Sequence, residues 1–144
     1  MKIIFLVIAV LLGILIFISS RTGNQVLNGS ELEAVLSYSE PIADNLFAGL
    51  AANDYTIFSR DFDADMQESI PADLFIGWKQ NLDDKLGDYI SHQVEQVTQS
   101  DEYYAVVYNV KFEKDEQVKV GIIFHAAEPH SINHLWIDSK KLKQ

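Results

Sequence analysis

The sequence predicts an α+β fold in which N-terminal helices pack on a curved four-stranded antiparallel sheet, preceded by one transmembrane helix. Three patterns support this prediction. An unbroken apolar run fills residues 3–18, apolar residues then recur at helical spacing, and from Tyr89 onward they alternate with polar residues. Helices followed by a run of strands are typical of the α+β class. The short loops between the strands require antiparallel pairing, because a parallel return needs a long crossover.

The apolar run predicts a transmembrane signal anchor over residues 1–20. With Ser19 and Ser20 the run would span roughly 27 Å as a helix, close to the thickness of a bilayer core. A cleavage site after Ser20 would place bulky Ile18 where signal peptides carry a small residue. We therefore expect an uncleaved anchor, with a cleaved signal and a secreted domain as the alternative.

The expected location is the cell membrane, crossed once, with the C-terminal domain outside. The apolar run begins at residue 3, as export signals do, and no later segment is apolar enough to stop translocation. The positive-inside bias is slight, because Lys2 precedes the run and Arg21 follows it. Residues 21–29 then form a polar stalk, and residues 30–144 form the domain.

Three helices are expected in the domain before the sheet. Ser30 and Glu33 have capping-box spacing, which predicts the start of the first helix. Pro41 fits the first turn of a second helix, because proline's missing N–H is not needed there. A third helix opens at Pro71, and Gly87 lies just past its end.

The period of two predicts the strands and their buried faces. Strands are expected over residues 89–97, 102–112, 117–125 and 132–138. The two middle strands each place one row of apolar side chains on a single face. The expected inward rows are Tyr104, Val106, Tyr108, Val110 and Phe112, then Val118, Val120, Ile122 and Phe124.

The segment between the helices resembles a known family. The stretch "ANDYTIFSRDFDADM", residues 52–66, followed by a helix ending in "LGDY", is similar to domain-of-unknown-function family 3887 (DUF3887). The resemblance runs from about Ile42 to Ile137. It implies membership of the nuclear-transport-factor-2-like (cystatin-like) superfamily and a cone of helices over a bent sheet, often enclosing a pocket. It implies no particular activity, because members of one superfamily differ in function.

Composition excludes several classes of function. The formal net charge is −10, and every acidic residue lies beyond Ser30, so the domain repels nucleic-acid phosphate. The chain has no cysteine, which excludes disulfides, thiol catalysis and cysteine–zinc sites. We expect no nucleic-acid partner and no cofactor.

Asp61, Asp63 and Asp65 alternate like the start of an EF-hand loop. That loop needs glycine at position 6 and glutamate at position 12, where this chain has Met66 and Ala72. The aspartates are therefore expected to be solvated or to cap a helix, with Arg60 able to pair with one of them. The resemblance implies that Phe62 points inward.

The histidines do not form a recognisable metal site. His130 and His134 have i, i+4 spacing but flank a predicted strand start, where that spacing does not converge, and no Glu follows His130 as HExxH requires. His125 lies opposite the apolar row of its strand. We interpret the four histidines, His92 among them, as surface residues and predict no metal ligands.

No catalytic residue is predicted, although an aromatic pocket is a candidate site. Tyr55, Trp78, Tyr108, Phe124 and Trp136 could line a cavity between helices and sheet, or could simply fill the core. An isomerase of this superfamily would need a pocket acid as general base. The middle strands offer no acid on their apolar face, and Glu95 on the first strand is the nearest candidate.

The sequence thus favours a membrane-tethered extracytoplasmic domain that binds an unknown small molecule or protein without catalysis. The alternative is a small-molecule enzyme of isomerase or hydratase type that uses the interior of the cone. Self-association as a homodimer through the outer face of the sheet is a further interpretation. Tyr103, Val107 and Ile123 make that face less polar than a solvated surface needs.

Overall fold

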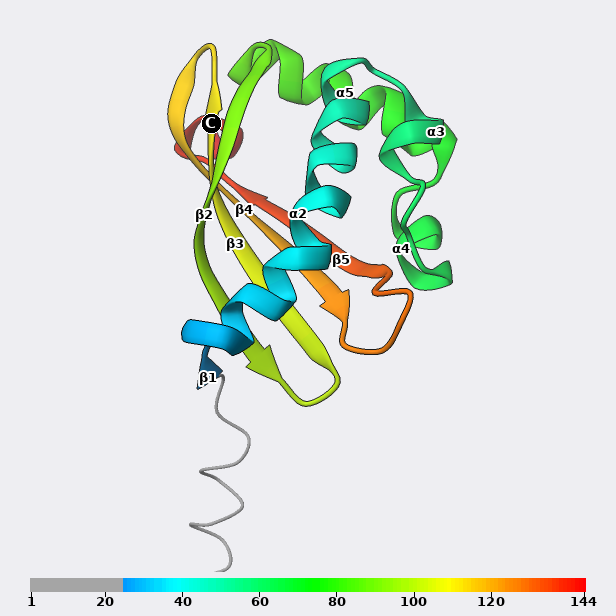
Figure 1. The fold of residues 1–144 in the computed structure, drawn as a ribbon. Coiled ribbons are helices and arrows are strands. Elements are labelled where there is room, and N and C mark those ends of the chain that lie inside the picture. The colour runs from blue at the N-terminus through cyan, green and yellow to red at the C-terminus, as the bar shows by residue number, and fades with distance from the viewer. Residues whose placement is uncertain (1–24) are drawn as a thin grey trace, which may run out of the picture.

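The computed structural model of the 144-residue chain describes residues 25–144 and is shown in Figure 1. The predicted anchor and the first part of the predicted stalk lie outside these residues. Among residues 25–144, no helix has both the length and the apolar character needed to cross a bilayer.

The described chain is an α+β domain with a five-stranded antiparallel sheet in the order β1-β2-β3-β4-β5. The helices are α2 (Gly29–Ala51), α3 (Tyr55–Phe58), α4 (Ala64–Ser69) and α5 (Ala72–Leu86), followed at the C-terminal end by the 3-10 turn η1 (Lys140–Lys143). The strands are β1 (Gln25–Val26), β2 (Tyr89–Ser100), β3 (Tyr103–Phe112), β4 (Asp115–His125) and β5 (Ile132–Asp138). The predicted class and strand order are confirmed, but the sheet has five strands instead of four.

The fifth strand comes from the segment predicted as stalk. Gln25 and Val26 pair with Gln99 and Thr98 of β2. The next residue, Leu27, donates its backbone N–H to the Val97 carbonyl at 2.9 Å, and it is only 6% exposed. The end of the predicted stalk is therefore part of the domain. The sequence did not predict this strand, because two residues are too few to show alternation of apolar and polar side chains.

Helix α2 is a single helix of 23 residues, where the sequence predicted two. Pro41 lies inside it, and the residue at the N-cap position is Asn28, not the predicted Ser30. A proline inside a helix costs about 3 kcal/mol, whereas burying one large apolar side chain contributes about 1.5–3 kcal/mol. The helix continues through Pro41 because one face buries Val35, Ile42, Leu46, Phe47 and Leu50.

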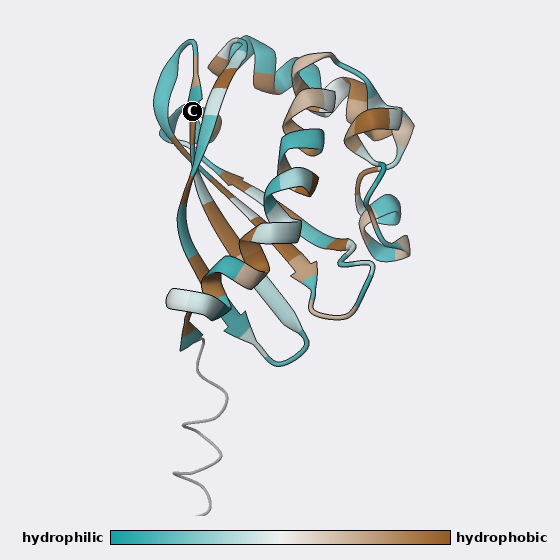
Figure 2. Ribbon diagram, in the orientation of Figure 1, coloured by the Kyte–Doolittle hydropathy of each residue, from teal (hydrophilic) through white to brown (hydrophobic). Residues whose placement is uncertain are grey.

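The helices gather on one side of the sheet, and α2 lies along the middle strands (Figure 1). Figure 2 shows hydrophobic residues concentrated on β3 and β4 beneath this helix. The predicted inward rows of both strands are buried, apart from half-buried Tyr104. Phe47 connects the two layers, because its ring stacks on Tyr89 and meets Tyr108 edge to face at 5.7 Å. The core therefore lies between α2 and the inner face of the sheet.

Gly49 allows α2 to approach α3 closely. A Cβ at this position would lie 2.3 Å from the backbone N of Phe58, closer than two such atoms can approach. We expect Gly49→Ala to reduce the free energy of unfolding by about 3 kcal/mol, because the two helices must separate and uncover Phe58.

Gly77 on α5 is the matched control, since nothing lies within 4 Å of the Cβ position there. Gly77→Ala should increase stability by about 0.5–1 kcal/mol, because alanine loses less backbone entropy in a helix. Urea denaturation of both variants measures the two effects. Equal effects of the two substitutions would contradict the close approach of α2 and α3.

Candidate functional site

The sequence predicted a candidate pocket between the helices and the sheet, but side chains fill that interior. Tyr108 and Phe124 are both 0% exposed and belong to the central core cluster. Tyr55 and Trp78 are partly buried and pack against that cluster. The Tyr55 hydroxyl donates to the Ile70 carbonyl at 2.7 Å. These four side chains act as core residues.

Trp136, the fifth predicted lining residue, lies on the opposite face of the sheet. It pairs with Gly121, and a Cβ at Gly121 would lie 2.0 Å from the indole ring. Its neighbour Leu135 points inward instead and is buried. Since side chains alternate between the faces of a strand, the register of β5 puts Trp136 outside. The prediction that Trp136 faces the interior was wrong.

A carboxylate does reach the interior, but it comes from a helix. The Tyr108 hydroxyl donates to Glu40 Oε1 at 3.1 Å. Burial, and then the charge and hydrogen bond of Glu40, raise the pKa of Tyr108 far above its ordinary value. Glu95, the acid proposed from the sequence, instead binds Lys119 Nζ at 2.7 Å. Both of those side chains are substantially exposed, so Glu95 is wrong as an interior acid.

Glu40 was not predicted as an interior residue because Pro41 was interpreted as the start of a second helix. In one continuous helix, Glu40 is four residues after Leu36 and seven before Phe47, so all three share a face. The signal was therefore present in the spacing. To use this spacing, Pro41 has to be interpreted as an interior residue of one continuous helix.

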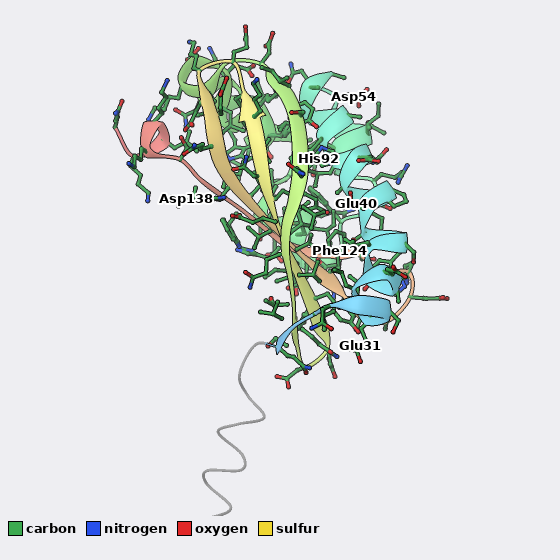
Figure 3. All side chains as sticks on the ribbon, turned by 60° about the vertical axis from the view of Figure 1, so that its left-hand side comes forward. Glu31, Glu40, Asp54, His92, Phe124 and Asp138 are labelled. Carbon is green, nitrogen blue, oxygen red and sulfur yellow. The ribbon has the colours of Figure 1, made fainter. Side chains whose placement is uncertain are left out.

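His92 is part of a second polar cluster between α2 and β2. Its Nε2 lies 2.9 Å from Asp44 Oδ1, its Nδ1 is hydrogen-bonded to the Tyr89 hydroxyl, and its ring stacks on Phe47. Burial and the nearby Asp44 carboxylate raise the pKa of Tyr89 to about 12. Figure 3 shows His92 on β2 beside the helix that carries Glu40.

The interpretation of the histidines as surface residues therefore fails for two of them. The His92 side chain is 13% exposed, and the His130 ring stacks on Tyr38 with centroids 3.5 Å apart. His134 is exposed as predicted, and the side chain of His125 is one-third exposed. Both rings stack on aromatic side chains of α2, and the alternation of residues along a strand cannot predict such contacts.

The aspartate-rich segment is a structural connection. Asp63 caps α4 by accepting from the Met66 N–H at 2.8 Å, as the sequence suggested. Its other oxygen lies 2.7 Å from His125 Nε2 and accepts from Asn133 at 2.8 Å. Asp63 thereby joins α4 to β4 and β5.

The remaining residues of this segment have separate roles. Arg60 pairs with Asp61 at 2.9 Å, and Phe62 is buried as expected. Asp65 lies exposed in the first turn of α4. Within residues 25–144, no group of three or more His, Asp and Glu side chains is arranged to hold a metal ion.

Within residues 25–144, several surface hollows lie around the sheet, and three of them are described below. One of about 390 Å³ is on the outer face and is lined by Thr98, Ser100, Tyr103, Ala105, Ile123 and Asn133. A second, of about 410 Å³, runs between β1, β2 and the start of α2. A third, of about 300 Å³, opens between α2 and the ends of β2, β3 and β4. None of these three includes Glu40, Tyr108 or His92 among its lining residues.

The geometry defines an α+β domain with helices on one sheet face, a filled interior and shallow surface hollows. A family model described as a protein of unknown function, DUF3887, matches residues 43–128, which is more than half of the chain. The chain belongs to this family, as its resemblance predicted. In the two other comparisons, no curated protein and no solved structure matches the chain.

Asp63 predicts a specific dependence of stability on pH. Partial burial opposes ionisation of its carboxyl, but hydrogen bonds from Asn133, His125 and the Met66 N–H outweigh burial and lower the pKa of Asp63. A lowered folded-state pKa means that its stabilisation is complete above the unfolded pKa, about 4. That stabilisation is lost as the pH falls through the folded value.

We therefore expect Asp63→Asn to lose about 1 kcal/mol of stability at pH 7, because an amide has only one acceptor oxygen and cannot both cap α4 and accept from Asn133 and His125. Below about pH 4 the difference from the parent chain should shrink. Thermal melts across the acidic range measure both effects. Asp65→Asn is the control, and a difference of the same size and pH dependence for it would refute the role of Asp63.

Proposed function

We propose that this chain is a membrane-tethered extracytoplasmic domain that binds a ligand or partner and performs no catalysis. The observation that carries the proposal is the filled interior. Tyr108 and Phe124 are fully buried where a superfamily enzyme would hold its substrate. An interior without room for a substrate leaves the surface as the functional part of the domain.

The same proposal includes a more specific assignment of the fold. We assign the domain to the cone-like, nuclear-transport-factor-2-like (cystatin-like) folds. Support comes from the helices on one face and from the two register shifts in β2, at Tyr89–Ser91 and at Val94–Gln96. Such shifts bend and twist a strand, which is how a sheet curves around a helical layer.

The outer face of the sheet is the surface best suited to a partner. Tyr103, Ala105, Val107 and Ile123 are half-buried there, and Trp136 is 37% exposed over Gly121. The helices cover only the opposite face (Figure 1). Exposed aromatic and aliphatic side chains in one patch are typical of protein interaction sites.

A second copy of the chain is the proposed occupant of this outer face. A two-fold arrangement would bring the same apolar residues of two copies together. The nearby lysines do not oppose such contact, because Lys119 is paired with Glu95 at 2.7 Å and Lys111 with Glu116 at 3.4 Å. Lysines paired within one copy add little repulsion between two copies.

The Glu40–Tyr108 pair favours the alternative of a small-molecule enzyme of isomerase or hydratase type. An acid beside a tyrosine supplies the base and the oxyanion donor that proton transfer at carbon requires. However, the Tyr108 hydroxyl already donates to Glu40, and its ring is 0% exposed. A substrate would have to displace both the pair and the packing around it, so binding without catalysis is the stronger proposal.

Chemical cross-linking tests the outer face in the intact membrane. The chain has no cysteine, so Val107→Cys creates a single reactive site at the centre of that face. A short bismaleimide should then join two copies into a dimer band. Adding Trp136→Glu should abolish the dimer, because an unpaired carboxylate would be buried in the contact.

The matched control is Ile76→Cys on α5, a position 70% exposed on the helical side. It should give little dimer, although its thiol is the more accessible of the two. A heavier adduct formed only by Val107→Cys would identify a different protein as the occupant. Equal dimer from both positions, or none from Val107→Cys, would refute the proposed dimer.

Topology is tested by labelling with a membrane-impermeant maleimide. Glu102→Cys places a thiol in the exposed turn between β2 and β3. We expect labelling in intact cells and retention of the full-length chain in the membrane after a carbonate wash. A cysteine inserted after Met1 should react only after lysis. The opposite pattern would place the domain inside the cell, and a shortened, released chain would indicate signal cleavage.

A further inference from the structure

The hollow between β1, β2 and the start of α2 is lined mainly by aliphatic side chains, and we call it the apolar groove. Its volume is about 410 Å³, within the range of ligand pockets. Six of its eight lining residues are aliphatic: Val26, Leu27, Leu32, Leu36, Val94 and Val97. The other two are Glu95 and Gln96. The groove therefore offers an apolar surface with few polar side chains.

The floor of the apolar groove is held by the core, whereas its rim is open to solvent. Leu27 and Val97 are buried, and the Leu27 N–H donates to the Val97 carbonyl at 2.9 Å. The other aliphatic lining residues keep part of their surface accessible: Val26, Leu32, Leu36 and Val94. Val26 is 55% exposed. A rigid concave site with accessible aliphatic surface is suited to an apolar occupant.

The apolar groove lies at the end of the domain that follows the predicted anchor. One wall is β1, which begins at Gln25 and lies beside the C-terminal end of β2 and the first turns of α2 (Figure 1). Five peptide steps separate Gln25 from Ser20, the last residue of the predicted anchor, and they reach at most about 18 Å when fully extended. An anchored domain therefore holds the groove close to the bilayer surface.

The charges around the apolar groove favour a neutral occupant. Glu95 is the one charged residue among the lining residues, and it is paired with Lys119 Nζ at 2.7 Å. Glu31 and Glu33 flank Leu32 along α2, and both are exposed. Exposed carboxylates repel anionic head groups. A lipid with a zwitterionic head group meets no such repulsion.

We propose that the apolar groove binds an acyl chain of a zwitterionic lipid from the bilayer that holds the anchor, so that the domain docks against the membrane. The acyl chain packs between Leu32 and Leu36 of α2 and Val94 of β2. The tether keeps lipid at a high effective concentration, so a weak contact is sufficient. This inference rests on the membrane tether of the proposed function, and it leaves the outer face of the sheet free for a second copy.

Quenching of an introduced tryptophan tests the docking, with the full chain reconstituted in phosphatidylcholine liposomes. Leu32→Trp places an indole in the groove. Ala34→Trp is the matched control, exposed and about 200° around the same helix. Lipids with bromine on their acyl chains quench an indole on contact. After subtraction of the signal from Trp78 and Trp136, Leu32→Trp should lose most of its fluorescence and Ala34→Trp should retain it.

A second pair of variants connects the quenching to the groove. Leu36→Glu, added to Leu32→Trp, should abolish quenching, because a carboxylate in the groove resists burial beside an acyl chain. Leu74→Glu on α5, at a position 57% exposed, is its control and should leave quenching unchanged. Thermal melts of both variants separate a loss of docking from a loss of folding.

Flotation of the liposomes after a carbonate wash distinguishes failure of the tether from failure of the groove. A chain that does not float with the lipid would refute the tether. In a chain that floats, equal quenching at the two tryptophan positions would show mere closeness to the bilayer and would overturn the lipid site alone. An unquenched but blue-shifted Leu32→Trp would overturn it too, because protein would then cover the groove.

Discussion

Burial of one face of α2 against the inner face of the sheet is the contact on which the rest of the structure depends. Val35, Ile42, Leu46, Phe47 and Leu50 provide that face. The helix lies beside β2 and over β3 and β4, so it joins strands that are far from it in the sequence. It also keeps Pro41 within a continuous helix, although proline in isolation would end or bend it.

Both polar clusters of the interior are consequences of this packing. Glu40 and Asp44 sit one turn apart on α2, and the fixed position of the helix brings them to Tyr108 and His92. Glu40 gives the buried Tyr108 hydroxyl a partner, and the largely exposed Asp44 gives one to the mostly buried His92 ring. The same packing buries the Tyr108 ring completely and brings its hydroxyl to Glu40.

The two ends of α2 have different surroundings. At its C-terminal end, Gly49 allows contact with α3, and Asp54 caps that short helix by accepting from the Ile57 N–H at 3.1 Å. At its N-terminal end, a hollow of about 300 Å³ lies between α2 and the ends of β2, β3 and β4. The buried Tyr38 hydroxyl there has no hydrogen-bond partner among residues 25–144.

The sequence alone determined the class of the domain, its strand order and its family. Those depend on local periodicity, on short loops and on the residues around Phe62, all of which can be read without a structure. It also predicted that Asp61, Asp63 and Asp65 are solvated or cap a helix, since capping involves only neighbours along the chain, but it did not single out Asp63. Tertiary structure decided the rest. The continuity of α2 through Pro41, the strand formed by Gln25 and Val26, and the outward position of Trp136 each depend on distant partners. Local propensity does not encode such partners, because the energy that selects them is gained only when the layers pack.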